Sequence, residues 1–172
     1  MISLSRYIVL VTFAVTVTSA PESRAEYLTS EHDPFFKPEK GKKKKEPVDI
    51  LRTRSLEPKV FGTGFNVKEA YQILYRTSHN TPEESSHVVT TVLVPYNVWS
   101  NTLIVLAEEQ DANALQCAPS YGYGADSLES IAFALDETMF LPYLKQGYIV
   151  TIPDHLGPLN AFAIGRTEGY MT

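Results

Sequence analysis

The chain has 172 residues, of which 44% are hydrophobic and 20% charged, with a single cysteine and a formal net charge of -5. This composition excludes a collagen-like, a disulfide-dense and a wholly disordered chain, and it favours one globular domain. Residues 1–60 carry 11 Lys and Arg against 8 Asp and Glu, whereas residues 61–172 carry 4 against 12. The first 60 residues therefore carry a net positive charge, and the remaining residues carry a net negative charge.

The first residues predict export. Arg6 precedes a short apolar run, residues 7–18 (YIVLVTFAVTVT), and Ser19 and Ala20 follow it as small residues. This is the pattern of a secretory signal peptide, and the run is shorter than the roughly 20 apolar residues of a membrane-spanning helix. We therefore expect a signal peptide over residues 1–20, with cleavage as late as residue 25. The mature protein is then secreted, extracellular and without a transmembrane segment.

Residues 21–58 predict an extended lead-in that runs over the surface. Pro34, Pro38, Pro47 and Pro58 interrupt any long helix, and Lys42 to Lys45 form a block of like charge. A basic block of this kind can bind an anionic surface, or it can simply be solvated. Nucleic acid is excluded as a partner for a secreted protein.

Residues 59–172 carry the pattern of a mixed sheet. Lys68 to Thr77 (KEAYQILYRT) alternates in hydrophobicity and Val88 to Val94 (VVTTVLV) is strongly β-branched, so the two segments predict adjacent antiparallel strands joined by a polar turn. Thr102 to Ala107 (TLIVLA) is continuously apolar, which predicts a strand buried on both faces.

A helix and a further strand follow. Ser127 to Gln146 has helical periodicity, with a second segment from Glu137 to Lys145, Asp126 as the N-cap and Gly147 as the stop. Tyr148 to Ile152 (YIVTI) predicts another buried strand. The order strand, helix, strand predicts a parallel pair with a right-handed crossover, and hence an α/β fold with an antiparallel lead-in.

Ligands in such sheets bind where the parallel strands end, so the loops 108–120 and 154–166 are the places to expect a site. Glu109 and Asp111 could act as a carboxylate pair in the first loop, but two residues so close together cannot flank a sugar bond from opposite faces, and solvated loop carboxylates are the preferred interpretation. Asp154 follows a strand directly, which predicts that it caps loop amides.

Cofactor and metal motifs are absent from the sequence. The nucleotide-binding patterns G-x-x-x-x-G-K-[ST] and G-x-G-x-x-G are missing, and so is the metal-binding pattern H-E-x-x-H. The four histidines also lack the spacing of metal ligands, so neither a cofactor nor a metal site is expected. The nucleophile motif G-x-S-x-G is missing as well. Cys117 is unpaired in a compartment that favours disulfides. It can pair between chains, remain buried, or have its partner in sequence beyond these residues.

Five segments in order resemble the fungal secretory lipases, which are α/β-hydrolases of the lipase A type. They are DPFFKP (Asp33 to Pro38), VKEAYQILYRT (Val67 to Thr77), VVTTVLVPYN (Val88 to Asn97), EEQDANALQCAPSY (Glu108 to Tyr121) and IPDHLGPLNAFAIGRTEGY (Ile152 to Tyr170). The pattern D-x-x-G-P-x-x-A-F-x-x-G-R-x-x-G-Y in the last of them is the most specific.

The resemblance implies an α/β-hydrolase that cleaves triacylglycerols and other esters with a Ser, Asp and His triad. It assigns Asp111 to the loop that forms the oxyanion hole, and Cys117 to a disulfide with a distant downstream cysteine. Since the nucleophile elbow of this fold follows the fourth strand and its helix, the 172 residues contain only the amino-terminal half of the sheet and lack all three members of the triad. We therefore expect an inactive fragment of a lipase.

A second hypothesis is a complete, non-catalytic secreted protein that binds a surface or a partner. Its basic lead-in and the exposed edge of an incomplete sheet would make the contacts, because an unpaired strand edge favours association.

Overall fold

The computed structural model describes residues 32–38, 48–60, 63–64, 66–99, 101–108, 110, 114–123, 130–161 and 164–172. The predicted signal peptide, most of the lead-in, Asp126 and the proposed helix start lie outside these residues. The described elements are η1 (Pro34–Phe36), β1 (Ile50–Ser55), β2 (Lys59–Val60), β3 (Thr63–Gly64), β4 (Glu69–Ser78), β5 (Ser85–Val94), β6 (Leu103–Val105), η2 (Leu115–Cys117), α1 (Pro119–Gly122), α2 (Ser130–Lys145), β7 (Ile149–Pro153) and α3 (Gly165–Met171).

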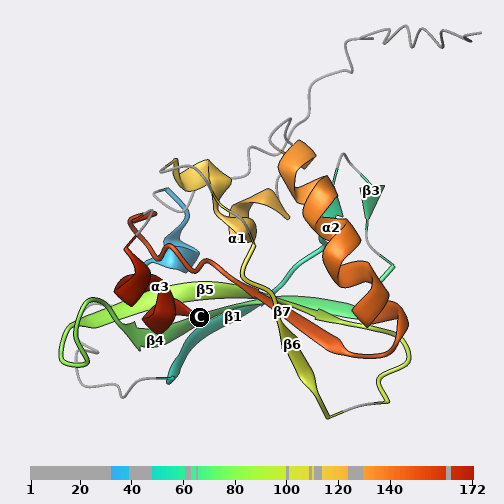
Figure 1. The fold of residues 1–172 in the computed structure, drawn as a ribbon, viewed down its shortest axis with the longest axis horizontal. Helices are drawn as coiled ribbons and strands as arrows, with labels where there is room; N and C mark the ends of the chain where they lie inside the picture. The colour runs from blue at the N-terminus through green and yellow to red at the C-terminus, as the bar shows by residue number, and fades with distance from the viewer. Residues whose placement is uncertain are drawn as a thin grey trace, which may run out of the picture.

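A five-stranded mixed sheet in the order β1-β4-β5-β7-β6 forms the centre of the fold. In Figure 1, α2 crosses the side of the sheet that holds β7, and α3 lies over the side that holds β4, in agreement with the contacts between these elements. The short pair β2 and β3 forms a separate antiparallel ribbon.

The predicted antiparallel pair is confirmed. β4 and β5 pair antiparallel over their whole length, from Glu69 opposite Val94 to Ser78 opposite Ser85. Ala70, Gln72 and Leu74 of β4 are buried, whereas the residues between them are only partly buried, as the alternating pattern requires. The predicted parallel pair is also confirmed, because Leu103, Ile104 and Val105 of β6 pair with successive residues of β7.

β6 corrects one expectation. The segment was expected to be buried on both faces, but Leu103 is 52% exposed and Val105 is 48% exposed. The reason is position in the sheet: β6 is its outer strand, and β7 is its one neighbour within the described part of the chain. A continuous apolar run indicates a strand, but it does not reveal whether a second neighbour covers it.

The predicted pair of helical segments is a single helix, α2, with Pro142 inside it. Proline removes one backbone donor, but Pro142 lies close to the helix end, since the helix continues for only three more residues, to Lys145. Gly147 has φ +85 and its N–H donates to the Leu144 carbonyl, 3.0 Å away. It therefore ends the helix as predicted.

Part of the predicted lead-in is integral to the fold, so the expectation of a surface-running segment is wrong there. Phe35 and Phe36 of η1 are buried and pack with Leu74 and Val89 on the sheet. Asp33 caps η1 by accepting a hydrogen bond from the Phe35 N–H at 2.8 Å, and β1 adds a strand antiparallel to β4. The prolines predicted that no long helix forms in this segment, but they gave no indication of this packing.

A second cluster of buried side chains lies between the sheet and α2. It comprises Leu56, Ala70, Leu93, Tyr123, Phe140, Leu144, Val150 and Ile152. At about 1.5–3 kcal/mol for each large apolar side chain that is fully buried, this cluster supplies much of the energy that fixes β7 and therefore the loop that follows it.

Gly147→Ala should lower the free energy of unfolding by more than about 1 kcal/mol, because a Cβ in this left-handed conformation would collide with Trp99 and with the Asn97 carbonyl oxygen. Gly169→Ala is the matched control. Gly169 lies in α3 with open space around its missing Cβ, so alanine there should be neutral or stabilise by up to about 1 kcal/mol. Urea unfolding of both variants checks this, and an equal effect of the two substitutions would contradict it.

Candidate active-site edge

The loops that follow β6 and β7 lie together at the carboxyl ends of the two parallel strands, as the sequence predicted for a site. Gln110 Nε2 donates to Asn160 Oδ1 at 2.8 Å, and Asn160 Nδ2 donates to the Ala114 carbonyl at 2.7 Å. Asn160 is 2% exposed and has φ +51, a conformation that Asn adopts more readily than most residues. The Asn160 side chain, in the loop after β7, therefore anchors the loop after β6 at two residues, Gln110 and Ala114.

Asp111, the predicted residue of the oxyanion hole, lies outside the described residues, as does Glu109 of the proposed carboxylate pair. The two anchored residues, Gln110 and Ala114, bracket the segment 111–113. Asp111 therefore remains a prediction, while the residues on both sides of it are fixed to the loop after β7.

Asp154 follows β7 and caps the start of α1, as predicted. The Ser120 N–H donates to Asp154 Oδ1 at 2.8 Å and the Ser120 hydroxyl donates to Oδ2 at 2.5 Å. Burial raises the pKa of the Asp154 carboxyl to about 7, although both hydrogen bonds from Ser120 act to lower it. The cost of placing a charge in the interior exceeds the gain from two donors.

A second contact joins the same segments. The Tyr123 hydroxyl donates to a carboxylate oxygen of Glu108, and both residues are buried. The Tyr123 ring meets Phe140 of α2 edge to face, with ring centroids 5.9 Å apart. The first residues after β6 are thus tied both to α1 and to the core under α2.

Hydrogen bonds continue from Asp154 across the sheet to η1. Gln72 Nε2 donates to the Ser120 carbonyl, and Gln72 Oε1 accepts from Arg54 Nε at 2.8 Å. Arg54 Nη1 in turn donates to Asp33 Oδ2 at 2.6 Å. The five residues Asp33, Arg54, Gln72, Ser120 and Asp154 form what we call the buried polar chain, which joins η1, β1, β4, α1 and the loop after β7. Gln72, Ser120 and Asp154 are buried, whereas Asp33 and Arg54 at its η1 end are partly exposed.

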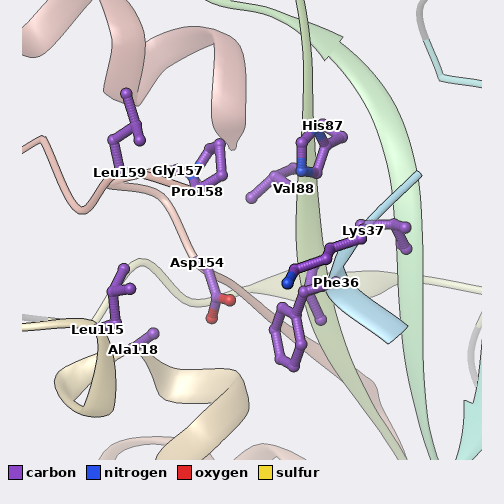
Figure 2. Close-up of a pocket in the computed structure, with 12 residues that line it drawn as sticks. Phe36, Lys37, His87, Val88, Leu115, Ala118, Asp154, Gly157, Pro158 and Leu159 are labelled. Carbon is purple, nitrogen blue, oxygen red and sulfur yellow. The ribbon is translucent and has the colours of Figure 1, made fainter. Parts of the chain in front are cut away.

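A cavity of about 440 Å³ opens beside the buried polar chain (Figure 2). Its wall combines Phe36 and Lys37 at the end of η1, Leu74 and Val89 on the sheet, and Asp154 after β7. The remaining lining residues are His87, Val88, Leu115, Ala118, Gly157, Pro158 and Leu159. The wall is mostly apolar, with a few polar groups, and its volume is within the range of about 300–1,000 Å³ that small-molecule sites occupy.

Cys117 ends η2 and is partly exposed with a free thiol. Among the residues that the structure describes, no three His, Cys, Asp or Glu side chains are grouped as ligands for a metal ion would be. In the same described ranges, no helix is both long and apolar enough to cross a membrane.

The comparisons with known proteins agree with this geometry. A family model described as secretory lipase matches residues 124–172. The secreted triacylglycerol lipase LIP1 of Malassezia furfur is 58% identical over 141 residues, which are 82% of this chain and 29% of that protein. The secreted triacylglycerol lipase LIP3 of Malassezia restricta is 38% identical over 171 residues, which are 96% of this chain and 36% of that protein.

The fold comparison defines the class. The crystal structure of Candida antarctica lipase A in its closed state matches with a TM-score of 0.73 and 30% identity, and the match covers 84% of this chain and 34% of that one. The sheet is therefore that of an α/β-hydrolase of the lipase A type, with antiparallel lead-in strands before the parallel pair.

The chain belongs to the fungal secretory lipase family, as the five sequence segments predicted. It spans about a third of the length of the relatives that it matches. Those relatives are named secreted lipases, which confirms the predicted extracellular location.

Loss of the Asp154 proton should make the chain less stable as the pH rises towards neutrality. The folded state raises the carboxyl pKa from 3.8 to about 7, so its contribution to stability is complete below the lower value and is lost as the pH rises through the higher one. Burial lowers the pKa values of His87 and His155, so these side chains make the protein less stable as the pH falls below about 6.5. Their effect on stability is therefore opposite to that of Asp154. Asp154 therefore lowers the free energy of unfolding between about pH 4 and about pH 7.5. The fall should be clearest from about pH 6.5 to about pH 7.5, where the histidines no longer oppose it, and the free energy of unfolding should level off by about pH 8.

Asp154→Asn is the matched variant for this measurement. The asparagine amide is neutral at every pH and can still accept from the Ser120 N–H, so the fall over this range should disappear. A slope that is the same in the variant and in the parent chain would show that Asp154 is not its source.

Proposed function

We propose that this chain is part of a secreted triacylglycerol lipase and that it contributes the oxyanion-hole loop containing Asp111. The observation that carries the proposal is the double anchoring of that loop by Asn160, which binds Gln110 on one side of Asp111 and Ala114 on the other. An oxyanion hole requires donors that are held in place before the charge develops. The substrate class comes from the names of the relatives, which are triacylglycerol lipases.

The chemistry of ester hydrolysis also explains what the 172 residues would lack when alone. A serine hydroxyl becomes a competent nucleophile only when a histidine removes its proton, and the donors of the oxyanion hole then stabilise the tetrahedral intermediate. The sequence contains no G-x-S-x-G motif. We therefore expect these residues to have no lipase-like turnover by themselves, and the activity to need a nucleophile elbow contributed by further sequence.

Cys117 is assigned in this proposal to a disulfide with a cysteine outside these residues. It is the one cysteine of the sequence, and it lies just before α1, close to the loop that Asn160 anchors. A bridge at this position would restrain the segment between the oxyanion-hole loop and α1.

The test begins with the transcript beyond the codon for Thr172. We expect an open reading frame with G-x-S-x-G within roughly 30 residues, and hydrolysis of tributyrin by the whole product but not by the 172-residue chain. In the whole product, Asp111→Pro removes the backbone N–H at this position and should lower kcat by about a hundredfold, as the loss of one oxyanion-hole donor does in other hydrolases. Asp49→Ala, before β1, is the matched control and should leave kcat unchanged. Turnover of tributyrin by the 172-residue chain at lipase rates would contradict the proposal.

The exposed outer strand favours a second candidate, a non-catalytic secreted protein that associates through its sheet edge. Half-exposed Leu103 and Val105 on β6 are the observation in its favour. A stop codon after Thr172, together with stable monomeric secretion and saturable binding of a partner, would support this candidate over the lipase.

A further inference from the structure

The cavity beside the buried polar chain has an apolar interior that the hydrogen-bonded loops do not fill. Leu74, Val88 and Val89 supply its floor on the sheet, each no more than 2% exposed, and Phe36 closes one side. Leu159, which is 74% exposed, lies at the opposite wall on the loop after β7. An aliphatic chain placed here would contact carbon on several sides.

One positive charge points into this apolar space. Figure 2 shows the Lys37 side chain extending past Phe36 across the cavity towards Asp154, while His87 lies on the wall above it. Lys37 forms no ion pair with any residue of the described part of the chain. Both carboxyl oxygens of Asp154 accept hydrogen bonds from Ser120, and the Lys37 ammonium carries three N–H donors that a bound anion could accept from.

We propose that this cavity binds a long-chain carboxylate, with the carboxylate at the Lys37 ammonium and the aliphatic chain along Phe36, Leu74, Val89 and Leu115. The inference rests on the proposed function in one respect: ester hydrolysis by a lipase releases such acids. The cavity would then be a site for the product acid.

The wall chemistry favours an anionic amphiphile over other occupants. A neutral alcohol would leave the ammonium without a charged partner, whereas a carboxylate makes a charge-assisted hydrogen bond to it. At pH 6.5 the His87 imidazole, whose pKa burial lowers, is mostly neutral, and the Asp154 carboxyl, whose pKa is about 7, is mostly protonated. Lys37 is then the main charged group among the residues that line the cavity. One cation and a long apolar wall match the single head group and chain of a fatty acid.

Isothermal titration of the 172-residue chain at pH 6.5 with decanoate, below its micelle concentration, tests the proposal. We expect saturable binding of one decanoate for each chain, and weak or undetectable binding of butyrate, whose chain is too short to use the wall. Lys37→Met should weaken decanoate binding by about tenfold, the usual effect of losing a charge-assisted contact. The same variant should change the binding of 1-decanol, which has no charge, by less than about twofold.

Two further variants separate the cavity from the rest of the surface. Lys145→Met removes a lysine at the end of α2, outside this cavity, and should leave decanoate affinity unchanged. Leu159→Glu places a negative charge on an exposed position of the cavity wall, where it cannot disturb the core, and should weaken decanoate more than 1-decanol. Circular dichroism of every variant checks that the fold is retained.

The proposal is overturned if decanoate binding is not saturable, if Lys37→Met leaves it unchanged, or if Lys145→Met weakens it equally. A dimer in sedimentation that the Leu159→Glu substitution dissociates, with no decanoate bound to the parent chain, would also overturn it. Binding is measured without any hydrolysis, so its failure leaves the lipase proposal intact. If decanoate binds saturably but the whole product of the open reading frame does not hydrolyse tributyrin, only the lipase proposal is contradicted.

Discussion

The buried polar chain is the constraint on which the rest of the structure depends. A polar side chain removed from water without a partner costs about 1–3 kcal/mol, so Gln72 and Ser120, both fully buried, can be accommodated only if their hydrogen bonds are made. Gln72 uses its carbonyl oxygen for Arg54 and its amide for the Ser120 backbone. The position of α1 over the sheet is therefore fixed by β4, and Asp154 adds two further hydrogen bonds to Ser120 from the loop after β7.

The same chain explains why a cavity forms next to the loops. Arg54 stacks over the Phe35 ring, 4.2 Å from its centroid, while its guanidinium holds Asp33, so η1 is held against the sheet at one place. The loop after β7 is held against α1 at another by Asp154. Between these two anchors the side chains of Leu74 on β4 and of Val88 and Val89 on β5 line the cavity. Asp154 is thus both a structural cap and part of the wall, and the pKa raised by its burial links stability to pH.

Local sequence patterns could predict the strands, the helix and the helix stop because each depends on near neighbours. The alternation in β4, the β-branched run in β5 and the left-handed Gly147 all belong to this class. The partners of Arg54, Gln72 and Asn160 could not be predicted, since each bonds to residues that are 18 to 50 positions away. The exposure of β6 was missed for a related reason: burial depends on the neighbour that a strand has in the sheet. Five ordered segments carried the family resemblance, which physical patterns alone would not have revealed, and Asp111 remains a prediction.

Hydrogen–deuterium exchange of a Gln72→Met variant tests the central claim most directly, because methionine has a similar size and cannot make either hydrogen bond. If the buried polar chain acts as a unit, the backbone N–H groups of Phe35 and Ser120, which bond to Asp33 and Asp154, should both exchange at least about tenfold faster. Gly147, at the end of α2, should keep its protection, and the exposed substitution Gln146→Met should change neither amide. Unchanged protection at Phe35 and Ser120 in the Gln72→Met variant would contradict the account.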